Sequence, residues 1–259
     1  MKTEYTYLPG YSQNATEFMA ARTAQSHAAF LFPSLRPGVR VLDCGCGPGT
    51  ITLGLARLVD PGEVVGLDQE ISQIEIARKS SAAMGLNVRF EAGSIYRLPF
   101  PDCSFDVVFS HALFEHLHDP LAALAELHRV LRTGGLVALR SPDWGGFLVF
   151  PESSLVRAAL EYYQALQVEA GGDTRVGRKF KRLLAQGGFS ELRFSASYEC
   201  YDSLDRIAEY VARRIDLSST NKPLAERQRI EAYATEMRRW AHSEDGVFAQ
   251  SWCEIIGKK

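Results

Sequence analysis

Val41-Leu42-Asp43-Cys44-Gly45-Cys46-Gly47-Pro48-Gly49-Thr50 is the stretch that decides the fold of this chain of 259 residues. The mostly apolar run from Val39 to Leu42 predicts a buried strand that ends at an acidic residue. Glycines at alternate positions follow, and a helical pattern begins at Ile51. Strand, glycine turn and helix form nucleotide sites in α/β sheets, because glycine lets a ligand approach the backbone closely.

The spacing of these glycines argues against a dinucleotide. The turn has the pattern G-x-G-x-G, whereas the dinucleotide fingerprint requires a glycine at Thr50, and the Lys-Ser/Thr pair of a P-loop is missing. Asp43 would repel a pyrophosphate but suits an ammonium group. The turn therefore favours a nucleoside that carries an amino acid.

The segment from Asp43 to Gly49 resembles the first motif of class I S-adenosylmethionine (SAM)-dependent methyltransferases, in the ubiquinone/menaquinone-type and secondary-metabolite subgroup. The resemblance covers residues 36–142 and continues in order through Asp68, Gly93, Asp106, Arg129 and Gly135. It implies an α/β, Rossmann-like class I methyltransferase fold, with a seven-stranded, mostly parallel sheet, helices on both faces and a helical lid. It also implies SAM as cofactor and S-adenosyl-L-homocysteine as product.

Composition and charge argue against several other classes of protein. A net charge of −2 gives no general attraction to nucleic acid or to an anionic membrane. No apolar run of about 18 residues occurs, and the odd number of cysteines suggests a reducing compartment. We expect a cytoplasmic monomer or homodimer without metal, whose partner is a small-molecule methyl acceptor.

Three regions are expected along the chain. Residues 1–35 form an N-terminal arm and a helix, predicted over Asn14–Phe32, that lies over the cofactor. Residues 36–142 form the SAM-binding core, in which strands and helices alternate as in a parallel sheet. Residues 143–259 complete the fold, with helical lid insertions at about 145–187 and 203–243.

Several residues are expected to hold the cofactor. Asp43 and the Gly45 backbone would bind the amino group of the methionine part, and Asp68 is placed to accept hydrogen bonds from ribose hydroxyls. Arg22 is either a partner for the methionine carboxylate or a solvated charge on a helix. The resemblance adds Tyr11, Cys46, Gly47, Gln69, Gly93, Ser94, Ile95, Ser110 and His111, and Ser94 stands where the family commonly has an aspartate.

The chemistry at the acceptor is less determined by the sequence. His111, His116 and Asp143 follow the carboxyl ends of predicted strands and are candidates for a general base, although a carboxylate or neutral amine acceptor needs none. The histidines near Glu115 could instead hold a metal, but the sequence contains no second cluster of ligand residues that would support this alternative. Candidates for binding the acceptor are Trp144, Tyr162, Tyr201 and Arg213, with Tyr210 and Trp240 as further residues of the lid.

We therefore predict a SAM-dependent methyltransferase that acts on a small molecule, with oxygen as the favoured acceptor atom and nitrogen or carbon open. An RNA or protein methyltransferase is one alternative, and it requires the basic segment Arg175–Arg182 to border the pocket. A non-catalytic SAM-binding protein is another, and a dinucleotide oxidoreductase is a remote one. No Asn-Pro-Pro-Tyr-like tetrapeptide follows the fourth strand, which argues against methylation of base or amide nitrogens.

Overall fold

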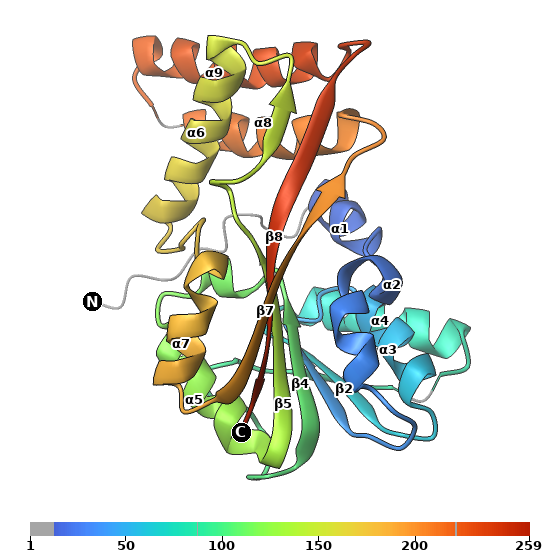
Figure 1. Cartoon of the computed structure of the whole chain (residues 1–259). Coiled ribbons are helices and arrows are strands. Elements are labelled where there is room, and N and C mark those ends of the chain that lie inside the picture. Colours follow the sequence, from blue (N-terminus) through green and yellow to red (C-terminus); the bar gives the residue numbers. More distant parts are fainter. Residues whose placement is uncertain (1–12, 87, 221) are drawn as a thin grey trace.

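A computed structural model describes residues 13–86, 88–220 and 222–259, in which eight strands form one sheet (Figure 1). The strands are β1 (Val41–Cys44), β2 (Val64–Asp68), β3 (Arg89–Ala92), β4 (Phe105–His111), β5 (Leu131–Pro142), β6 (Leu148–Phe150), β7 (Ser190–Cys200) and β8 (Val247–Lys258). They follow the order β3-β2-β1-β4-β5-β8-β6, with β7 paired to β8. The first five strands are parallel, and β8 is antiparallel to β5, β6 and β7.

The eighth strand corrects the predicted count of seven. It is the short strand β6, which lies in a segment expected to be a loop and helices. β8 is long enough to pair with β5 as far as Pro142, opposite Trp252, and then with β6 from Leu148, opposite Ala249. β6 therefore extends the sheet beyond β5, toward the end at which the site lies.

The N-terminal region is not the single helix predicted over Asn14–Phe32. It forms α1 (Gln13–Ala20), α2 (Ala24–His27) and the 3-10 helix η1 (Ala29–Ser34). Thr23 starts α2 with a capping box, in which its side chain accepts from Ser26 N. This break between α1 and α2 places Arg22 at a corner of the chain.

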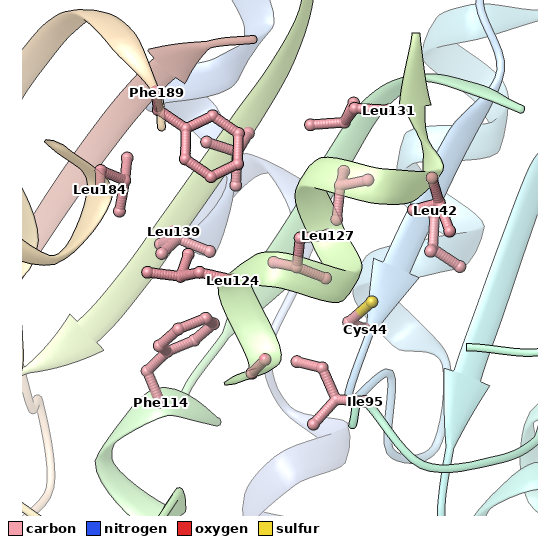
Figure 2. Packing of buried hydrophobic residues seen from close by; sticks show 14 of the residues in the cluster. Leu42, Cys44, Ile95, Phe114, Leu124, Leu127, Leu131, Leu139, Leu184 and Phe189 are labelled. Carbon is pink, nitrogen blue, oxygen red and sulfur yellow. The ribbon is translucent and has the colours of Figure 1, made fainter. Parts of the chain in front are cut away.

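Helices cover both faces of the sheet (Figure 1). α3 (Thr50–Val59) and α4 (Ile71–Ala83) lie on one face with α2, and α5 (Pro120–Val130) and α7 (Phe180–Gln186) lie on the other. Figure 2 shows Leu124 and Leu127 of α5 beside Leu42 and Cys44 of β1 in the larger core cluster. Burial of such side chains contributes roughly 1.5–3 kcal/mol each, so this core fixes the carboxyl end of β1 firmly.

A separate group of helices caps one end of the sheet (Figure 1). It contains α6 (Ser154–Glu169), α8 (Asp205–Ser219) and α9 (Leu224–Trp240), and its core is rich in aromatic residues, among them Trp144, Trp240 and Phe248. β7 and β8 run from the sheet into this cap. Within the described part of the chain, no helix is both long and apolar enough to cross a membrane.

Candidate active site

The glycine turn after β1 joins β1 to the carboxyl end of β2. The amides of Gly45 and Cys46 both donate to the Leu67 carbonyl, at 2.7 and 3.0 Å. The amide of Gly47 donates to Asp68 Oδ2 at 2.9 Å. Gly45 and Gly47 adopt φ angles of 75° and 51°, which glycine adopts without steric cost. The turn therefore holds Asp68 in a fixed position beside the backbone.

A first cavity with about 780 Å³ of empty space opens at these carboxyl ends. Its lining contains ten of the predicted site residues: Arg22, Gly45, Gly47, Asp68, Gln69, Gly93, Ser94, Ile95, His111 and His116. Met19, Leu67, Tyr96, Ala112, Leu113 and Leu117 complete it. Residues from four strand ends and from the N-terminal region thus meet around one space.

Asp43 lies deeper, in a smaller adjoining cavity that also contacts Gly45, Cys46 and Gly47. Its carboxylate is buried and accepts a hydrogen bond of 2.7 Å from Thr52 Oγ1. Burial raises the pKa of Asp43 to about 7, against the hydrogen bond from Thr52, which lowers it. Because an ammonium group would favour the ionised form, this position is suited to a cationic ligand.

A second cavity, with about 570 Å³ of empty space, lies between the sheet and the cap. It shares Met19, Arg22, Ala112 and His116 with the first cavity, so that the two are neighbours across a common wall. Six aromatic side chains line it: Phe18, Trp144, Tyr163, Tyr201, Tyr210 and Trp252. Its polar lining residues other than Arg22, His116 and the tyrosines are Glu115, Gln167 and Gln250.

Arg22 lines all three cavities. Its guanidinium lies 5.6 Å from the centre of the Phe18 ring and 6.0 Å from that of Trp252. The side chain forms no ion pair or hydrogen bond with another described residue. It is therefore a cation at the junction of the cavities that remains available to an anionic group.

The two predicted histidines are buried and neutral. His111 packs against the rings of His27 and Trp252, with centroid distances of 5.0 and 4.8 Å. Its Nδ1 and Nε2 have no hydrogen-bond partner among the residues that the structure describes. Burial, and next the nearby Arg22, hold the pKa of His111 well below its usual value and that of His116 at about 3. Both imidazoles are thus weak bases.

Asp143, the third candidate base, lines neither the first nor the second cavity. Arg178 holds its carboxylate in a bidentate pair, with Nε to Oδ2 at 2.8 Å and Nη2 to Oδ1 at 2.7 Å. The Asp143 side chain thus positions the loop after β5 and is occupied by a cation. This geometry does not favour the predicted role as base.

Other predicted residues also lie away from the cavities. Ser110 is inside the sheet, where its hydroxyl donates to the Cys44 carbonyl at 2.9 Å. On α6, Tyr162 points toward Ser218, and its neighbour Tyr163 lines the second cavity instead. Arg213 pairs with Glu209 at 2.7 Å on an exposed face of α8. Trp240 is buried in the core of the cap, and Tyr11 falls outside the described residues.

The basic segment Arg175–Arg182 borders neither the first nor the second cavity. Arg178 pairs with Asp143, and Lys179 pairs with Asp173. Arg175 lines a surface hollow on the other side of Trp144, which also lines the second cavity. The condition for an RNA or protein substrate is therefore not met by the described residues. Among these residues there is also no group of three or more histidine, cysteine or acidic side chains that could hold a metal ion.

Sequence reasoning missed several lining residues. In the first cavity these are Met19, Tyr96, Leu113 and Leu117, whose apolar character looks like ordinary core in the sequence. In the second cavity Glu115 is the important omission, since it stood in the segment after β4 but was considered only beside a metal. Trp252 reaches the site because β8 pairs with the end of β5.

Comparison with known proteins defines the class to which this site belongs. A family model described as a methyltransferase domain matches residues 35–188, more than half of the chain. An uncharacterised methyltransferase of Schizosaccharomyces pombe is 30% identical over 273 residues, which cover 98% of this chain and 96% of that protein. The chain therefore belongs to the class I SAM-dependent methyltransferases, and the predicted family and fold class are confirmed.

Two further similarities place it among its relatives. The demethylmenaquinone methyltransferase of Staphylococcus aureus is 39% identical over 173 residues, which cover 61% of this chain and 71% of that enzyme. The geranyl diphosphate C-methyltransferase of Streptomyces coelicolor, solved with Mg²⁺, geranyl diphosphate and S-adenosyl-L-homocysteine, is 14% identical with a TM-score of 0.58. That match covers 98% of this chain and 87% of the solved chain, and it shows a shared fold.

Proposed function

We propose that this methyltransferase transfers the methyl group of SAM to a small-molecule acceptor, with oxygen as the favoured acceptor atom and nitrogen or carbon as alternatives. The observation that carries the proposal is the pair of neighbouring cavities. One contains the residues of the cofactor motif, and the other is lined by aromatic side chains. Because they share a wall at Ala112 and His116, a donor in the first can face an acceptor in the second.

The residues of the first cavity and of the smaller cavity beside it suit SAM. Arg22, which has no ion pair with another described residue, offers its guanidinium to the methionine carboxylate, and Asp43 with the Gly45 backbone would hold the amino group. Each Asp68 oxygen accepts one backbone N–H, from Gly47 and from Glu70, both at 2.9 Å. A carboxylate has about four acceptor positions, so lone pairs of Asp68 remain for ribose hydroxyls.

The far end of the cavity suits an adenine ring. Gly93, Ser94 and Ile95 border it with backbone and small side chains, and Leu117 and Tyr96 add apolar walls. The Ser94 hydroxyl accepts from Tyr96 N at 3.2 Å, which leaves its own proton for a ring nitrogen. In this role Ser94 replaces the aspartate that is common in the family.

Bound SAM would supply an activated methyl group with a good leaving group, so the protein mainly has to orient the acceptor and exclude water. The cap supports this task, because Tyr163 of α6 and Tyr210 of α8 close the second cavity. Arg22 is the only lysine or arginine among the described residues that line it. With Arg22 assigned to the cofactor, the remaining surface favours an uncharged acceptor. The relatives whose names specify small-molecule substrates support the same class.

Calorimetric titration with SAM and with S-adenosyl-L-homocysteine tests the cofactor site. We expect micromolar binding by the wild type, weakened roughly 10-fold or more in Asp68→Ala through loss of the ribose hydrogen bonds. Asp245→Ala, at an exposed position remote from the motif, is the control and should bind as the wild type does. Binding of NAD or NADP in place of both ligands would disprove the proposal. Binding without transfer to any acceptor would instead favour a non-catalytic SAM-binding protein.

A further inference from the structure

The second cavity contains one acidic side chain among the described lining residues, and it has no assigned role. Glu115 lies in the 3-10 helix η2 (Phe114–His116), directly after β4, and is 3% exposed. Its Oε2 accepts a hydrogen bond of 2.8 Å from Ser141 Oγ on β5. Its Oε1 lies 3.8 Å from Nε2 of His116, which is neutral.

The backbone of Glu115 is held equally firmly. Its carbonyl accepts from Asp173 N at 2.8 Å and from Gln167 Nε2 at 3.2 Å. Gly172 passes so close that a Cβ there would lie 2.4 Å from this carbonyl oxygen. These contacts come from the sheet, from α6 and from the loop after α6, so they fix the carboxyl group at the boundary between the core and the cap.

Glu115 forms no ion pair with a lysine or arginine among the residues that the structure describes. Burial raises its pKa to about 7, although the Ser141 hydrogen bond and Arg22 act in the opposite direction. The titratable groups that line the cavity with it are His116 of the same turn, Arg22 from the N-terminal region, Tyr163 of α6, Tyr201 at the end of β7 and Tyr210 of α8. A carboxyl group with this pKa is matched to proton transfer near neutral pH.

The other candidate bases are less suitable. The two histidines have strongly lowered pKa values, Asp143 is paired with Arg178, and burial raises the pKa of Tyr201 and Tyr210 so that they remain donors. The aromatic walls favour a flat, uncharged ring. A phenolic hydroxyl, which ionises near pH 10 like that of tyrosine, needs a base but lies within reach of one.

We propose that Glu115 is the general base of the reaction and that the acceptor is a neutral aromatic compound with a hydroxyl group. This inference rests on the proposed methyl transfer. In the transfer step a carbon–oxygen bond forms while the methyl–sulfur bond breaks, and the sulfur leaves with the electron pair as a thioether. The hydroxyl proton goes to Glu115 Oε1, which later releases it to solvent. The products are the aryl methyl ether and S-adenosyl-L-homocysteine.

The test compares Glu115→Gln with the wild type on probes of different acidity. The probes are phenol, catechol and 4-nitrophenol, whose hydroxyl ionises near neutrality, together with benzylamine and thiophenol. Methyl transfer is measured by mass spectrometry under single-turnover conditions. We expect the variant to lose about 100-fold or more in rate on phenol and catechol but far less on 4-nitrophenol, because an ionised acceptor needs no base. The wild-type rate on phenol should rise with pH through about 7 and level off, and the variant should lose this rise.

Two measurements keep the outcome interpretable. The affinity of Glu115→Gln for SAM should stay within about twofold of the wild type, because the carboxyl group does not line the first cavity. Glu244→Gln, at an exposed position, is the matched control and should behave as the wild type. An equal loss on phenol and 4-nitrophenol would reduce Glu115 to a structural role. If SAM binds and an amine or thiol is methylated but no phenol is, the proposed acceptor class is wrong. It is also wrong if SAM binds and none of the probes is methylated. Failure of SAM to bind would instead refute the proposed function itself.

Discussion

The two cavities differ in how the chain builds them. Apart from Met19 and Arg22, the first is made by segments between Gly45 and Leu117 that form or follow the carboxyl end of a strand. The second collects residues from Ala15 to Trp252, contributed by α1, the segment after β4, the loop after β5, α6, the residue after β7, α8 and β8. The cofactor site is thus a property of the parallel sheet, whereas the acceptor site exists only where the cap packs against it.

The chemistry of the two linings differs in the same way. The first has the glycine turn and Asp68 in its lining, with Asp43 in the smaller cavity beside it, whereas aromatic rings and one buried glutamate line the second. Changes in the glycine turn should therefore affect cofactor binding strongly and acceptor preference little. Changes in the cap should have the opposite effect.

The largest expected effect comes from Gly47→Val. A Cβ at this position would point into open space, with its nearest neighbour, Met19 Sδ, at 3.8 Å, and a valine would extend into the first cavity. We expect the affinity for SAM to fall by about 100-fold or more, which is roughly 2.7 kcal/mol. Gly85→Val is the matched control, since Gly85 has a similar φ of 64° with nothing within 4 Å. Both variants should lose thermal stability, and equal losses of affinity would contradict the assignment of the turn.

Arg22→Met separates the contribution of Arg22 to cofactor affinity from that of the residues that bind the nucleoside. We expect S-adenosyl-L-homocysteine to bind about 10- to 30-fold more weakly, as for the loss of a charge-assisted pair. 5′-Methylthioadenosine lacks the amino acid part, and its affinity should be unchanged. Arg206→Met is the control, because Arg206 also lies 5.6 Å from the Phe18 ring but lines neither the first nor the second cavity. A similar loss for both ligands would argue against the carboxylate contact.

The first cavity could be predicted from the sequence because its residues are tied to strand ends. Once the glycine turn and the strand order are recognised, Asp68 and Gly93 must lie at the same edge of the sheet as Asp43. The break at Thr23 is a local feature that helical spacing does not reveal, because the apolar pattern continues across it. The role of Arg22 therefore stayed open until its position between α1 and α2 was known.

The second cavity could be predicted only in outline. An aromatic cap was expected, but whether Tyr162 or Tyr163 faces inward depends on how α6 rotates against α8 and α9. Glu115 was overlooked because a glutamate in sequence gives no sign that Ser141 and Gln167 will bury it. Such contacts join residues far apart in the chain, and no local pattern encodes them.

The second cavity and the small cavity beside the first each hold a buried carboxyl group, Glu115 and Asp43, with a pKa of about 7. The dependence of stability on pH and on SAM can distinguish the two groups. A raised pKa stabilises the fold below the pKa of the unfolded chain, near 4.5 for Glu115, and this contribution is lost as pH rises through about 7. The free energy of unfolding of Glu115→Gln should therefore exceed that of the wild type by about 1–3 kcal/mol at pH 8, with little difference at pH 4.5. Urea denaturation at the two pH values measures this difference.

Asp43→Asn provides the comparison for that experiment. Without ligand it should show the same gain at pH 8, since burial raises both pKa values. With saturating SAM the free energy of unfolding of the wild type should rise to that of Asp43→Asn, because Asp43 would meet the ammonium group. It should stay below that of Glu115→Gln, because Glu115 would not meet that group. Greater stability of the wild type at pH 8 without ligand would show that the buried carboxylates are compensated in the fold.

The smallest effect is expected at Arg213, which was predicted to bind the acceptor. Its guanidinium is about half exposed and pairs with Glu209 one turn earlier on α8, an arrangement that contributes roughly 0.3–0.5 kcal/mol. Arg213→Ala should therefore leave both the KM for phenol and the affinity for SAM unchanged, whereas Tyr210→Ala, on the same helix but lining the second cavity, should raise that KM. Steady-state kinetics of the two variants with phenol measure this difference in KM. A clear rise of KM in Arg213→Ala would mean that the cap rearranges when the acceptor binds, so that the second cavity then reaches Arg213 on α8.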